Sequence, residues 1–120
     1  MKKNETKKTI KNIVCLEGVI TNYNCKYCEN GNAIIYLTVC VENTKGHSFI
    51  PVVVFKDSYS DFEQLSNDLN SIEIPKYNKG EDDFFKDYLP KLETVYIEGE
   101  LNSNTYNRNT TIQVIANVVK

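Results

Sequence analysis

Apolar and polar side chains alternate along five segments of this chain, the pattern that half-buried β-strands produce. The predicted strands cover residues 13–21, 33–41, 48–55, 94–101 and 110–119. Asn-rich stretches at 22–32 and 102–109 are predicted to be loops, and a tight turn is predicted at 43–47. The chain is therefore expected to be mainly β, with short connections between most of its strands.

The third of these strands separates two kinds of side chain. Alternation places Ile50, Val52 and Val54 on one face and Phe49, Pro51, Val53 and Phe55 on the other. Ile50, Val52 and Val54 can supply the buried face of this strand. Phe49 and Phe55 can therefore lie on its exposed face, although aromatic strand residues are more often buried. Pro51 lacks a backbone N–H, which predicts an edge or a local irregularity at this point.

The middle of the chain changes from a strand pattern to a helical one. Residues 60–63 have the form of a capping box, and Phe62, Leu65 and Leu69 follow at helical spacing. A second helix is predicted over 82–89. Helix between the third and fourth of five strands is the element order of an OB-fold, a partly open barrel that binds oligonucleotides. We therefore predict a single all-β OB-fold domain over 12–120, with an acidic helical insertion at about 57–91.

Charge is distributed unevenly, although the formal net charge is only −2. Residues 1–11 carry five lysines and one glutamate and are predicted to form a flexible basic arm. Residues 57–93 carry ten acids and four lysines, whereas the predicted strands are close to neutral. Any nucleic-acid contact would therefore depend on stacking and a few cations rather than on a broad positive field.

Four cysteines, Cys15, Cys25, Cys28 and Cys40, are expected to be free thiols. No signal peptide or membrane-length apolar run is apparent, so a cytoplasmic location is predicted. Cys25 and Cys28 form a lone CxxC, which leaves a zinc site or a redox motif as weaker alternatives because zinc prefers four ligands. No carboxylate, His or Ser cluster suggests catalysis, and neither a cofactor nor a metal is predicted.

Three segments resemble the bacterial and phage single-stranded DNA-binding protein family, over about residues 13–118. They are Asn12–Ile20, Phe49–Phe55 and the ungapped run Tyr88–Leu101, which contains Val-Tyr-Ile-Glu-Gly-Glu-Leu. The resemblance implies an OB-fold that stacks DNA bases on aromatic rings, with Phe49, Phe55 and Tyr106 at three of the family's four stacking positions. The fourth, near Val41–Thr44, has no aromatic residue. The sequence ends at Lys120 after the last strand, which implies a divergent member without the family's acidic tail.

The predicted binding residues follow from the strand pattern and from this resemblance. They are Phe49, Phe55, Tyr106, Arg108, Tyr36, Thr38, Tyr23, Tyr27, Lys26 and Lys56. Aromatic rings would stack on bases, and cations would meet phosphates. The expected function is non-catalytic single-stranded DNA binding in replication, recombination, repair or mobile-element maintenance, by a homo-oligomer. The alternative is an OB-fold accessory subunit that binds replication or recombination proteins and has little affinity for nucleic acid.

Overall fold

The structure is a computed structural model, and it describes residues 11–72 and 94–120. Residues 1–10 of the predicted basic arm and the predicted helix at 82–89 lie outside the described residues.

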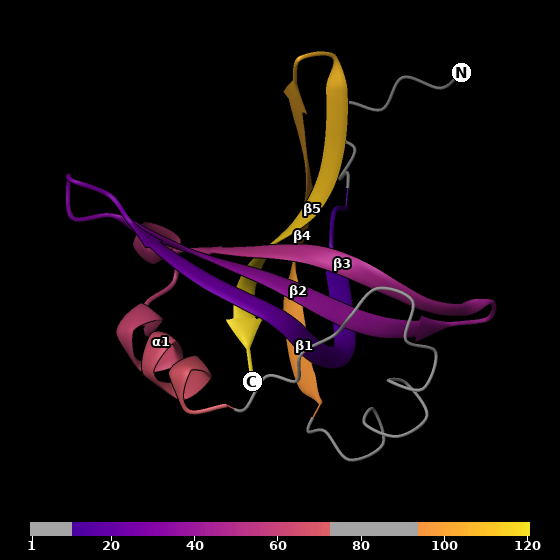
Figure 1. The fold of residues 1–120 in the computed structure, drawn as a ribbon, viewed down its shortest axis with the longest axis horizontal. Helices are drawn as coiled ribbons and strands as arrows, with labels where there is room; N and C mark the ends of the chain where they lie inside the picture. Colours follow the sequence, from indigo (N-terminus) through magenta and orange to yellow (C-terminus); the bar gives the residue numbers. More distant parts are fainter. Residues whose placement is uncertain (1–10, 73–93) are drawn as a thin grey trace, which may run out of the picture.

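Five strands form a closed barrel in the spatial order β1-β2-β3-β5-β4. The elements are β1 Val14–Tyr27, β2 Ala33–Asn43, β3 Gly46–Phe55, the 3-10 turn η1 Lys56–Ser58, α1 Phe62–Asn70, β4 Val95–Tyr106 and β5 Asn109–Val119. Helix α1 lies between β3 and β4 in the chain (Figure 1). The predicted OB-fold, with its helical segment after the third strand, is confirmed.

Most of the two Asn-rich segments is strand: the loop prediction was wrong for residues 22–27 and 102–106, and only 28–32 and 107–108 are turns. Strand β1 continues to Tyr27, and β4 continues to Tyr106. Polar residues did not end these strands because the paired backbones continue to the end of each hairpin, where Tyr27 pairs with Ala33 and Tyr106 pairs with Asn109. A hairpin supplies its own ladder of hydrogen bonds and needs no apolar face to continue outward. The β4–β5 hairpin consequently projects from the barrel (Figure 1).

The core is made by the inward faces of all the strands together with one face of α1. The side chains of Ile35, Ile97, Val39, Val52, Val54 and Val114 are fully buried. From α1, Phe62, Leu65 and Leu69 complete the same cluster, at the spacing that the sequence predicts. The helix therefore closes one side of the barrel, and its position is fixed by apolar burial.

Strand β3 has two neighbours over only part of its length. It pairs with β2 throughout, but its parallel pairing with β5 covers only Val52 and Val53. Pro51 thus lies where β3 has a single hydrogen-bonded partner, opposite Thr38. The missing N–H of proline costs no ladder bond on the open side, as the sequence predicted.

The barrel closes at two glycines that lie against neighbouring strands. A Cβ on Gly18 would collide with the carbonyl oxygen of Cys40, and one on Gly99 with the carbonyl oxygen of Ile115. Strand β1 changes partner at Gly18: residues up to it pair with β4, and residues after it pair with β2. The close approach of the two backbones therefore requires a residue with no side chain.

Replacing Gly99 with alanine should destabilise the fold by about 2–3 kcal/mol, because backbone atoms must move to admit the methyl group. Gly46→Ala is the control. Its φ of +141° is strained for alanine, but nothing lies within 4 Å of the added Cβ, so its cost should be about 1 kcal/mol. Urea denaturation measures both. Equal stabilities for Gly99→Ala and the unmodified protein would contradict the proposed close contact.

Candidate nucleic-acid interface

The outward face of β2 and β3 carries a continuous row of apolar and aromatic side chains, called here the platform. Its members are Ile34, Tyr36, Thr38 and Cys40 of β2 and Phe49, Pro51, Val53 and Phe55 of β3. Directly opposite residues share a face of an antiparallel pair. Ile34 pairs with Phe55, and Cys40 pairs with Phe49, so both ends of the platform carry an aromatic ring.

Two aromatic rings of the platform are accessible to solvent, although other members of the platform are buried. Tyr36 is 41% exposed and Phe49 39% exposed, whereas Val53 and Cys40 are buried between them. Phe55 is half-buried. Phe49 and Phe55 are six residues apart on one strand, which corresponds to about 20 Å at the rise of a β-strand. The platform is long enough for several consecutive bases.

Strand β1 extends the platform on the far side of β2. Asn22 lies opposite Thr38, Asn24 opposite Tyr36, and Lys26 opposite Ile34, and all three β1 residues are exposed. Lys26 therefore lies in the row that contains Phe55, as a phosphate contact would require. The two asparagines were missed from the sequence because their segment was predicted to be a loop, for which no strand face is defined.

Tyr23 and Tyr27 lie on the opposite face of β1, and the structure does not bring them to the platform. Tyr23 pairs with the core residue Leu37, and its hydroxyl is 3.4 Å from the Oγ atom of Ser66 in α1. Tyr27 is 64% exposed on the same side. Its interaction with the Cys25 thiol raises the pKa of the Tyr27 hydroxyl above its usual range. Both tyrosines face the side of the barrel where α1 packs.

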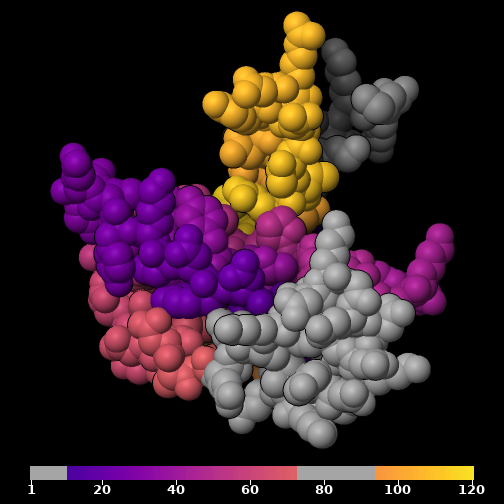
Figure 2. Space-filling view, in the orientation of Figure 1, coloured from indigo at the N-terminus to yellow at the C-terminus, as the bar shows by residue number. Residues whose placement is uncertain are grey.

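Tyr106 and Arg108 lie at the end of the projecting β4–β5 hairpin, which stands clear of the barrel strands in Figure 2. The Tyr106 side chain is 76% exposed. Asn107 and Arg108 form the two-residue turn with φ of +49° and +65°. Positive φ at both central residues matches the twist of a hairpin, but it is unfavourable for arginine. Glycine would adopt this conformation without a Cβ penalty.

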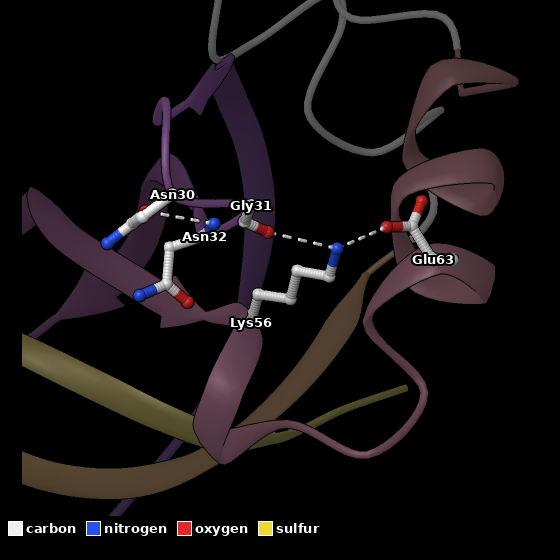
Figure 3. A network of polar contacts seen from close by, with 5 residues as sticks. All are labelled: Asn30, Gly31, Asn32, Lys56 and Glu63. Carbon is white, nitrogen blue, oxygen red and sulfur yellow. Dashed lines mark hydrogen bonds and ion pairs between the residues drawn. The ribbon is translucent and has the colours of Figure 1, made fainter.

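Lys56 follows Phe55 directly, but its ammonium group points toward protein partners. The Nζ atom donates a hydrogen bond to the carbonyl oxygen of Gly31 at 3.2 Å and forms an ion pair with Glu63 at 3.4 Å (Figure 3). The structure therefore brings Lys56 together with the turn after β1 and with α1, rather than with the platform.

The thiols differ mainly in accessibility. All four are free: Cys15 is exposed, Cys25 and Cys28 are partly buried, and Cys40, a member of the platform, is buried. Within residues 11–72 and 94–120, no three or more His, Cys, Asp or Glu side chains are grouped so that they could hold a metal ion.

No helix in the described ranges is long and apolar enough to cross a membrane.

Comparison with known proteins finds likeness at the level of structure. No protein-family model matches the sequence, and no curated protein matches it. Among solved structures, the single-stranded DNA-binding protein of Thermus aquaticus superposes with a TM-score of 0.59 at 16% identity, over 92% of this chain and 39% of the other. This chain thus spans less than half of the Thermus protein.

Two other solved structures are matched over nearly their full lengths. The SSB domain of a Synechococcus protein has a TM-score of 0.59 at 11% identity, covering 94% of this chain and 98% of that one. The mitochondrial single-stranded DNA-binding protein Rim1 of S. cerevisiae has a TM-score of 0.53 at 14% identity, covering 90% and 91%. The fold is an OB-fold barrel. These single-stranded DNA-binding proteins have a barrel of similar form.

The position of Cys40 predicts its chemical reactivity. Burial raises the pKa of the Cys40 thiol, with a smaller contribution from Glu42, so the thiolate that reacts with alkylating reagents is scarce as well as shielded. Timed iodoacetamide labelling with peptide mass spectrometry should show Cys15 modified first and Cys40 last. Equal labelling rates for these two residues would contradict the burial of Cys40.

Proposed function

We propose that this protein is a non-catalytic binder of single-stranded DNA that stacks bases on the platform. The observation that carries the proposal is the pair of accessible rings, Tyr36 and Phe49, on the outward face of β2 and β3, with Phe55 at the far end. Every base has a π-face, so a row of aromatic rings binds unpaired bases with little sequence preference. Duplex DNA keeps its bases stacked internally and offers no such faces.

Electrostatics supplies a smaller share of the proposed affinity. Lys26 flanks the Phe55 end of the platform, and Arg108 is at the tip of the β4–β5 hairpin. With two phosphate contacts, the logarithm of the binding constant should fall with the logarithm of salt concentration with a slope of roughly −1.4. The formal net charge of −2 is consistent with such a shallow dependence.

The structural comparisons support this assignment, because the solved structures with this barrel form include proteins described as single-stranded DNA-binding. We further propose a role in DNA replication, recombination, repair or mobile-element maintenance, in the cytoplasm, as a homo-oligomer, together with replication or recombination proteins. One solved structure with this fold, the N-terminal domain of PriB, is described as dimeric.

The direct test is a fluorescence anisotropy titration of labelled oligo-dT at low salt, with duplex DNA and RNA of matched length as competitors. Binding at micromolar protein, released poorly by duplex, is the expected result. No binding at tens of micromolar protein would refute the proposal.

Removing a platform ring should weaken DNA binding without unfolding the barrel. Phe55→Ala and Phe49→Ala should each cost about 1–3 kcal/mol of binding free energy, or roughly 5- to 150-fold in Kd. Tyr27→Ala is the matched control, because it removes an exposed ring from β1, on the opposite face of the same sheet. Anisotropy gives the affinities, and circular dichroism checks the fold. The platform is excluded if Tyr27→Ala weakens binding as much as Phe55→Ala does.

The strained turn predicts that stability and binding respond in opposite directions. Arg108→Gly should stabilise the protein by about 0.5 kcal/mol, because glycine adopts positive φ without a Cβ penalty. The same change should weaken DNA binding about threefold by removing a cation. Arg108→Lys keeps the charge and should bind almost normally. Urea denaturation and anisotropy separate the two effects, and unchanged affinity for Arg108→Gly would remove this residue from the interface.

The second candidate function is a protein-interaction module. The observation in its favour is the acidic outward face of β1 and β4, where Glu98 lies opposite Cys15 and Glu17 lies opposite Tyr96. That face repels phosphate. Co-purification with one fixed protein partner, combined with no detectable DNA binding, would favour this second candidate.

A further inference from the structure

The turn that joins β1 to β2 is held together internally by backbone bonds. The N–H of Cys28 donates to the carbonyl of Asn32 at 2.8 Å, and the N–H of Gly31 donates to the carbonyl of Cys28 at 3.2 Å. The side chain of Asn30 accepts a further bond from the N–H of Asn32 at 3.1 Å. Gly31 has φ of +84°, a conformation that glycine adopts without strain. These bonds define the shape of the turn but not its place beside the barrel.

Lys56 supplies the connection that places the turn. In the described part of the chain, its bond to the Gly31 carbonyl is the one hydrogen bond that joins residues 28–32 to an element outside their own hairpin. The same ammonium group contacts Glu63 in the first turn of α1 (Figure 3). Phe62 and Leu65 anchor that helix in the core. The helix thus holds the Glu63 carboxylate that orients the Lys56 side chain toward the turn.

The location of this link matters for the platform. Lys56 follows Phe55 in the chain, and Phe55 pairs with Ile34, two residues beyond the turn. Ile34 in turn lies opposite Lys26 of β1. The turn, the end of the platform and the proposed phosphate contact Lys26 therefore belong to one end of the β1–β2–β3 sheet. Movement of the β1–β2 hairpin would displace Lys26 relative to the Phe55 ring.

We propose that Lys56 is a positioning residue that fixes the turn at residues 28–32 against α1, beyond the point where Tyr23 joins the hairpin to Ser66 of that helix, and that it acts on bound DNA only through this placement. The proposal replaces the sequence-based prediction that Lys56 contacts phosphate, and it rests on the proposed function for its DNA-binding consequence. An exposed ion pair contributes little by itself. The charge-assisted bond to a carbonyl is the stronger partner, and the two together orient the lysine.

The first arm of the test needs no DNA. Amide hydrogen exchange should be at least about threefold faster at Cys28, Gly31 and Asn32 in Lys56→Met than in the unmodified protein. The amide of Lys45, which donates to the side chain of Asn43 in the β2–β3 turn, is the internal control and should not change. Lys56→Arg should keep most of the protection, and Glu63→Gln should lose part of it. Unchanged exchange in Lys56→Met would overturn the proposal.

The second arm measures oligo-dT affinity against salt concentration. Lys56→Met should weaken binding about three- to tenfold with the same salt slope, because no phosphate contact is lost. Lys26→Met, which removes a proposed phosphate contact at the same end of the sheet, should reduce the slope by about 0.7. A similar slope reduction in Lys56→Met would overturn the proposal in favour of a phosphate contact. If the unmodified protein binds no DNA, the proposed function fails, while the exchange arm still decides the positioning role.

Discussion

The alternation of side chains across β3 is the constraint on which the rest of the structure depends. Val52 and Val54 must fill the closed barrel, where both are fully buried. Because successive residues point to opposite faces, Phe49 and Phe55 are then required to face outward, in register with the outer face of β2. A shift of one residue would bury the aromatic rings and expose the valines. The energy of the core thus fixes the orientation of the surface that we propose for binding.

The polar ends of the β1–β2 and β4–β5 hairpins follow a different rule. Their strands continue because paired backbones satisfy each other, even where the side chains are polar. This extends β1 past the platform and brings Lys26 to the Phe55 end, and it places Tyr106 far out on the β4–β5 hairpin. The β4–β5 hairpin is exposed from residue 100 to residue 112, whereas the β1–β2 hairpin also packs Tyr23, Cys25 and Ala33 into the core. Local side-chain bonds tether both hairpins. Lys56 is such a tether for one hairpin, and the Asn12 side chain, bonded to both backbone groups of Leu101, is one at the base of the other.

The structure follows the sequence pattern most closely where a strong physical preference acts on a short segment. The sequence predicts three such features correctly: the alternating valines of β3, the helical spacing of Phe62, Leu65 and Leu69, and the open side of β3 at Pro51. The prediction failed at 22–27 and 102–106, because Asn has low strand propensity and pairing partners overrode that preference. Because 22–27 was predicted to be a loop, strand alternation was not applied to it. That alternation places Lys26 on one face of β1 and Tyr23 and Tyr27 on the other. The partners of Lys56 depend on the fold and have no sequence signal.

The most direct test of the central claim is to map the bound strand on the protein. Two-dimensional 1H–15N NMR spectra recorded during titration with oligo-dT would report which amides change environment. We expect shifts at Tyr36, Thr38, Phe49 and Phe55, with little change along α1 at 62–70. Shifts concentrated on α1 and Tyr27, with the platform unchanged, would contradict that claim.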